Sequence, residues 1–192
     1  MKHIFYHLTA VMVVVVWGMT FISTKVLIVH GLSAQEIFLF RFLLAYAAVC
    51  PISFHRFFAR NLKDELYLVG GGVLGGSLFF FLQNIALGLT QASNVSFIIC
   101  MAPLLTAVLT VLSVRTEKVS RGFIYGSIIA LLGVGLLIFN GSFILRISPL
   151  GDLLTLLASL SWAFYSLVIR SLTRKYSPAF ITRKIFFYGI IT

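Results

Sequence analysis

The sequence predicts an all-α polytopic membrane protein, and its composition is the first reason. Hydrophobic residues make up 60% of the 192 residues, charged residues only 10%, and the mean hydropathy is +1.06. A soluble domain of this size could not cover so much apolar surface. Several apolar runs also reach ~20 residues, the length that spans a hydrocarbon core of roughly 30 Å. Inside such a core only helices and closed barrels satisfy their backbone groups, and the long runs favour helices.

Seven spans follow one another along the chain. They are expected at residues 8–29, 34–54, 66–89, 95–114, 122–139, 150–169 and from 181 onward. The third and fourth form a hairpin around the uncharged turn 90–93, where Ser93 or Asn94 is expected to cap the second helix.

Basic residues gather in alternate gaps between the spans. They are Lys2; Arg56, Arg60 and Lys63; Arg115, Lys118 and Arg121; and Arg170, Arg174 and Lys175. The other gaps hold only Arg146. By the positive-inside rule the N-terminus and the basic loops are cytoplasmic, in a bacterial-type plasma (inner) membrane. Because the net charge of +10 falls in these gaps, nucleic acid is not an expected partner.

Several helix starts carry capping signals. Ser33 and Glu36 fit a capping box, and Ser148 and Ser177 each precede a first-turn proline. Asp152 follows in a first turn, where the helix dipole favours an anion.

Glycines recur at a spacing of four in two spans. The pairs are Gly71 with Gly75, Gly72 with Gly76, and Gly122 with Gly126. This spacing allows helices to approach closely in lipid. Close packing is the expected role, and a hinge is the alternative.

The start and the end of the chain share a weak repeat. Trp17 and Lys25 match Trp162 and Arg170, with an offset of 145 residues for both pairs. The two helices are the first and the sixth spans, an odd offset of five, so the second copy would be inverted, as in many secondary transporters. The expected fold is then an inverted-repeat transporter bundle: residues 1–146 form a first five-helix repeat, and 147–192 begin a second, truncated one. About seven of ten spans would be present, in a piece of a longer protein. The alternative is that tryptophan and the basic residues are interfacial anchors.

A few polar and aromatic residues inside the spans are candidates for a solute cavity. Lys25 could line it or snorkel to the outer surface. Arg41 is too deep for easy snorkelling and favours a pocket or a polar partner on a neighbouring helix; Glu36 is a weaker candidate partner, because capping explains it better. Asp64 and Glu65 are expected to pair with the adjacent basic loop. The full candidate set is Trp17, Lys25, Arg41, Asn84, Asn94, Pro103, Trp162 and Tyr165.

For the two tryptophans and the proline in this set, a role in helix packing is the alternative to lining a cavity. Trp17 and Trp162 would lie well inside their spans, where core packing competes with cavity lining. Pro103 frees a backbone carbonyl near Ile99 and should kink the fourth span, either for packing or at a transport midplane.

No enzyme motif is present: the sequence contains no H-E-x-x-H, P-loop or G-x-S-x-G pattern. The histidines form no metal-ligand spacing. No catalytic residue, metal or cofactor is therefore expected.

Motifs in order along the whole chain resemble the EamA-type family of the drug/metabolite transporter superfamily. They are Trp17-Gly18, Arg41-Phe42, the stretches 86–92 and 103–107, Glu117 before the glycines 126, 133 and 135, Gly151-Asp152, and 161–163. The resemblance implies ten helices in two inverted repeats, cytoplasmic termini, and export or uptake of small metabolites.

These expectations combine into a secondary transporter that works by alternating access. Its partners would be the lipid bilayer and a small metabolite or amino-acid-like solute, and Lys25 and Arg41 hint at an anionic or zwitterionic one. A homodimer is an open alternative to a monomer. The competing function is a non-transporting membrane scaffold or assembly subunit.

Overall fold

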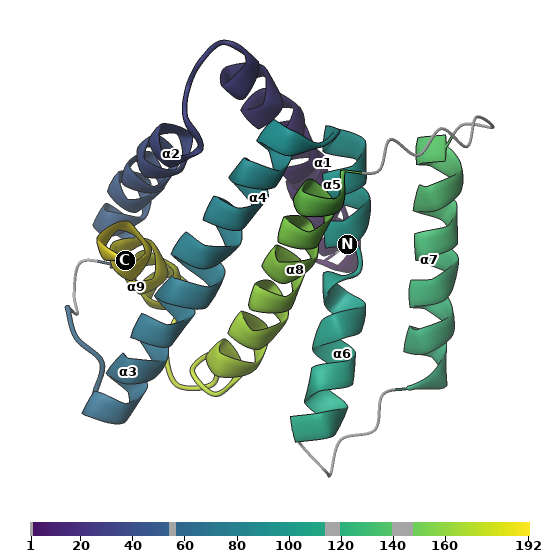
Figure 1. The fold of residues 1–192 in the computed structure, drawn as a ribbon. Helices are drawn as coiled ribbons and strands as arrows, with labels where there is room; N and C mark the ends of the chain where they lie inside the picture. The colour runs from purple at the N-terminus through teal and green to yellow at the C-terminus, as the bar shows by residue number, and fades with distance from the viewer. Residues whose placement is uncertain (1, 54–56, 114–119, 140–147) are drawn as a thin grey trace.

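The computed structural model describes residues 2–53, 57–113, 120–139 and 148–192. Within these ranges the chain forms seven helical rods (Figure 1). They are α1 (Lys2–Val29); α2 (Ala34–Val49) with η1 (Cys50–Ser53); α3 (Leu62–Gly71), η2 (Gly72–Leu78) and α4 (Phe79–Leu89) in one continuous rod; α5 (Ala92–Ile99) and α6 (Ala102–Ser113); α7 (Arg121–Phe139); α8 (Pro149–Arg170); and α9 (Pro178–Ile191).

Five of the seven expected spans have the length and hydropathy to cross a membrane. They are Ile4–Val29, Ala34–Ser53, Leu62–Leu89, Ala92–Ser113 and Pro149–Arg170. The other two fall short over the described residues. In α7 the apolar segment Arg121–Gly133 is shorter than a membrane span. The 14 residues of α9 extend only ~21 Å at 1.5 Å per residue.

The rods α4 and α8 lie side by side through the middle of the bundle (Figure 1). Helix α7 stands at one edge against α5 and α6, and α9 lies against α2 and η2. Most of α1 is apolar and exposed on the outside of the chain. Lipid solvates such a surface, whereas water would not.

The glycines of the long central rod make the predicted close contacts. A Cβ atom on Gly72 would lie 2.4 Å from the Tyr188 Cβ, and one on Gly75 would lie 2.4 Å from the Tyr165 ring. Gly71 and Gly76 face α9 in the same way. Three of these glycines fall in η2, which is a π-helix, a form that is common near functional sites.

The glycines of α7 make no such contact with the described part of the chain. Neither Gly122 nor Gly126 has any described atom within 4 Å of an added Cβ. Helix α7 lies against α5 and α6, and these two glycines do not lie in those contacts, so their close packing stays a prediction.

Two of the expected caps are confirmed. Ser33 Oγ accepts from the Glu36 N–H at 3.2 Å while Glu36 Oε2 accepts from the Ser33 N–H at 2.8 Å, which completes the capping box. Ser177 Oγ accepts from the Phe180 N–H at 3.4 Å.

The other two expected caps differ in outcome. Ser148 occupies the N-cap position of α8 before Pro149, as expected, but its side chain makes no capping bond, and its backbone N–H donates to Asp152 Oδ2 at 3.2 Å. Neither Ser93 nor Asn94 caps α5, because that helix already begins at Ala92, with Gln91 in the capping position.

The interruption expected near Pro103 is confirmed. Helix α5 ends at Ile99 and α6 begins at Ala102, so the rod breaks one turn before the proline that lacks an N–H. Ser159 of α8 donates to the Ile98 carbonyl oxygen at 3.3 Å beside this break. Polar groups freed in an apolar helix need such partners.

Candidate functional site

Aromatic side chains from three rods meet near the middle of the bundle. Trp162 of α8 contacts Phe79 of α4, with ring centroids 4.8 Å apart, and Trp17 of α1, at 5.9 Å. Tyr165 follows one turn later on α8, 5.1 Å from Trp162. We call these four residues the aromatic cluster. It unites three of the candidate residues, Trp17, Trp162 and Tyr165, and joins the two tryptophans that the predicted repeat matches.

Lys25 closes one end of the α4–α8 pair. Its ammonium donates to the carbonyl oxygens of Leu87 and Thr90, the latter at 2.9 Å. These carbonyls end α4, where unpaired acceptors and the helix dipole favour a cation. In this structure the Lys25 ammonium therefore binds backbone carbonyls of the neighbouring rod, and its part in solute binding stays a prediction.

Thr90 collects further polar contacts at the same place. Its hydroxyl donates to Asp152 Oδ1 of α8 at 3.4 Å and accepts from Asn94 Nδ2 of α5 at 3.4 Å. We call Lys25, Thr90, Asn94 and Asp152 the Thr90 end. It places two candidate residues, Lys25 and Asn94, within one polar group.

Arg41 has the polar partner that its depth predicted. Its Nη1 donates to Thr24 Oγ1 of α1 at 3.0 Å, and its guanidinium carbon lies 5.7 Å from the Phe80 ring centroid. Glu36, considered as a partner, is engaged in the capping box. Arg41 therefore joins α2 to α1 and α4.

Of the two remaining candidates, Asn84 is buried and Pro103 is exposed. Asn84 Nδ2 donates to the Ala34 carbonyl oxygen at 3.2 Å and so ties α4 to the start of α2. Pro103 acts through the break before α6, described above.

The opposite end of the pair carries a group of charges in which Asp64 and Glu65, expected as ion partners, meet cations and phenols that were not among the candidates. Asp64 of α3 forms an ion pair with Lys175 at 2.8 Å and accepts from the Tyr176 hydroxyl at 2.9 Å. Glu65 forms an ion pair with Lys184 of α9 and accepts from the Tyr188 hydroxyl. We call these six residues the Asp64 end.

The partners of Asp64 and Glu65 correct the expectation of a local pairing. Among the described residues, both acids form ion pairs with cations more than 100 residues away in the chain, and not with Arg60 or Lys63 of the adjacent loop. The hydrogen bond to Asp64 raises the pKa of Lys175 above its ordinary value. A usable signal was present: two adjacent cations, Arg183 and Lys184, lie inside an apolar helix, and such residues require partners.

Arg183 and Lys184 are buried, with 3% and 4% of their surfaces exposed. Arg183 donates to the Ser53 carbonyl oxygen at the end of η1 and lies over the Phe57 and Phe180 rings. Helix α9 is thereby fastened to α2 through η1 as well as to α3.

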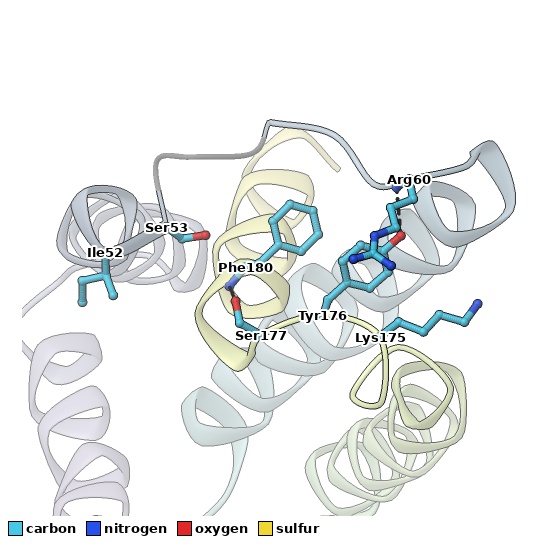
Figure 2. A pocket seen from close by; sticks show the side chains of 7 residues that line it. All are labelled: Ile52, Ser53, Arg60, Lys175, Tyr176, Ser177 and Phe180. Carbon is cyan, nitrogen blue, oxygen red and sulfur yellow. Dashed lines mark hydrogen bonds between the residues drawn. The ribbon is translucent and has the colours of Figure 1, made fainter.

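A hollow of about 360 Å³ opens beside the Asp64 end (Figure 2). Its lining residues are Ile52, Ser53, Arg60, Lys175, Tyr176, Ser177 and Phe180. Figure 2 shows the Lys175 side chain extending away from Phe180, in keeping with its bond to Asp64. A smaller hollow of about 70 Å³ is lined by Tyr46, Phe57, Phe58, Arg183, Lys184 and Phe187. Neither hollow includes any of the eight candidate residues.

The described ranges contain no group of three or more histidine, cysteine, aspartate or glutamate side chains placed to hold a metal ion.

Long apolar rods with polar groups confined to their ends and a few internal positions define a multi-pass membrane protein. The sequence model of the EamA-like transporter family matches residues 4–139, which is most of the chain. The chain belongs to the EamA-like transporter family, a family of transporters and not of enzymes. No curated protein and no solved structure matches the chain.

Family membership implies transport of a solute across a membrane. The matched segment lies within the predicted first repeat, 1–146. The division at 146 and the second repeat, 147–192, stay predictions.

Proposed function

We propose that the chain is part of a secondary transporter that moves a small metabolite or amino-acid-like solute by alternating access. The observation that carries this proposal is the aromatic cluster in the middle of the bundle, with polar contacts closing the rods at both ends. Aromatic faces provide apolar contact area for a small solute, and a few polar groups orient it. Polar contacts at each end can break in turn, because neither joins the rods covalently.

The contact between Trp17 and Trp162 supports an inverted repeat in this proposal. In inverted-repeat transporters the substrate site lies near the midplane, where the two repeats meet. Residues from equivalent positions of two such repeats would then face one another across the site.

The transport test uses Trp162→Ala in proteoliposomes loaded with labelled amino acids. We expect at least about a tenfold loss of exchange, because a large aromatic contact is removed from the solute. Trp162→Phe should lose less. Tyr125→Ala, on the exposed face of α7, is the matched control and should exchange normally. A wild-type protein that moves no solute would favour the scaffold alternative.

The proposed orientation places the N-terminus in the cytoplasm of a bacterial-type plasma membrane, as the basic loops predict. Single cysteines at Arg60 and Gln91, in a background with Cys50 and Cys100 replaced by serine, test it. An impermeant thiol reagent should label position 91 in intact cells and leave position 60 unlabelled. The reverse labelling would overturn the orientation.

A homodimer through α7 also belongs to the proposal. Gly122 and Gly126 lie one turn apart with open space over both, which suits the close approach of a second helix in lipid. Gly126→Leu should then shift the protein from dimer to monomer in light scattering, whereas a wild-type monomer would refute the pairing.

A further inference from the structure

Three amide atoms in α4 are buried without a partner among the described residues. Gln83 has only 1% of its surface exposed, and neither its Nε2 nor its Oε1 makes a hydrogen bond. Asn84 is equally buried; its Nδ2 has a partner but its Oδ1 has none. Buried amides in folded proteins almost always have partners, so this pair requires an explanation.

The Gln83 amide lies on the inner face of α4, between the aromatic cluster and the Thr90 end. Phe79, four residues earlier on the same helical face, contacts Trp162. Ala86 and Leu87, three and four residues later, belong to an apolar core with Phe21 and Val95. An unpaired amide in such surroundings destabilises the fold relative to a leucine of similar size.

The cations of this part of the bundle are already engaged within the protein. Lys25 binds the two carbonyl oxygens that end α4, and Arg41 binds Thr24. Lys184, at the other end, pairs with Glu65. Among the described residues, Gln83 is therefore the buried side chain of α4 whose amide has neither its donor group nor its acceptor engaged, while Asn84 lacks a partner only at Oδ1.

From this geometry we infer that the Gln83 carboxamide recognises the transported solute, and that the solute offers it an uncharged donor–acceptor pair, as a carboxamide does. The inference rests on the proposed transport function and narrows its solute class. It narrows the hint of an anionic or zwitterionic solute, because Lys25 and Arg41, which suggested that hint, are bound to groups within the protein. The amide stays unpaired when the rods are closed and becomes paired when a solute enters.

The test compares Gln83→Leu with wild type in two measurements on the full chain. One is exchange of labelled glutamine into proteoliposomes, with labelled glutamate as the anionic probe of the same shape. The other is the melting temperature in detergent. Gln35→Leu is the matched control, because Gln35 is an exposed glutamine in the first turn of α2.

We expect Gln83→Leu to melt at or above the wild-type temperature and to lose about tenfold or more in glutamine exchange, the effect of a hydrogen-bonded pair. Wild type should prefer glutamine to glutamate, and Gln35→Leu should change neither measurement. A group that only stabilises the fold would instead lower the melting temperature.

Three results would overturn the inference: unchanged glutamine exchange by Gln83→Leu, a lower melting temperature for Gln83→Leu, or a wild-type preference for glutamate. If wild type exchanges neither probe but exchanges other labelled amino acids, the inference is wrong and the proposed transport function stands. If wild type exchanges no labelled amino acid at all, the proposed transport function fails and the inference fails with it.

Discussion

The Thr90 end and the Asp64 end close the same pair of rods with different chemistry. At the Thr90 end the one cation, Lys25, binds neutral backbone carbonyls, and the side-chain contacts of Thr90 are 3.4 Å long. At the Asp64 end two carboxylates meet two lysines and two phenols, and Lys184 is almost fully buried.

This difference indicates which end opens more readily. At the Thr90 end each charged group, Lys25 or Asp152, contacts only neutral partners among the described residues, and the contacts of the Thr90 hydroxyl are long, so separating them costs less. Separating the buried ion pair of Glu65 and Lys184 leaves two charges without their partners. We expect the Thr90 end to open first from this conformation, and the Asp64 end to open only when its charges gain water or a solute.

The largest expected effect comes from breaking the buried pair at the Asp64 end. Glu65→Gln leaves the Lys184 charge without its counter-ion, which should cost about 3–5 kcal/mol of unfolding free energy. Replacing Glu65 and Lys184 together by leucine should restore most of the lost unfolding free energy, because no charge is then left without a partner. Melting in detergent, followed by tryptophan fluorescence, measures both variants.

The matched control is the neighbouring pair. Lys175 has 49% of its side chain exposed, so Lys175→Met should lower the melting temperature much less than Glu65→Gln, because water screens an exposed pair. Because its pKa is raised by Asp64, the contribution of this pair is present at neutral pH and is lost as the pH rises through the raised value. If Glu65→Gln and Lys175→Met lowered the melting temperature equally, the buried pair at Glu65 would contribute no more to stability than the exposed pair at Asp64.

A smaller effect is expected where the central rod meets α9. In Gly72→Ala the new Cβ would lie 2.4 Å from the Tyr188 Cβ, so α9 must shift, at a cost of about 1–3 kcal/mol. The same substitution at Gly126, over open space, should stabilise α7 by up to about 1 kcal/mol. A Gly72→Ala protein that melts like wild type would mean that α9 is not held firmly against the central rod.

The smallest expected effect lies at the Thr90 end. Lys25→Met removes the cation from the end of α4 and should cost about 1 kcal/mol. Amide hydrogen exchange should speed up across residues 86–91 and stay unchanged in α3. Arg41→Gln, which loses the Thr24 contact but leaves the cap of α4, is the control. Faster exchange at the Asp64 end instead would reverse the proposed order of opening.

Much of the fold could be read from local sequence, because local physics determines it. Hydropathy located the rods to within a few residues, Ser33 with Glu36 marked the start of α2, and Pro103 placed the break between α5 and α6. Each of these features depends on residues within about one helical turn.

The bonding partners of the site residues depended on tertiary structure. Helical spacing predicts which face of its helix a residue occupies, but it does not predict which other helix packs against that face. Lys25 was equally consistent with a snorkelling anchor until α4 was seen to end beside it. Asp64 and Glu65 found cations more than 100 residues away, which no local pattern specifies. The sequence by itself determined a helical membrane protein with an aromatic and polar interior; the packing of α4 against α8 decided which charges are engaged and left the Gln83 amide unpaired.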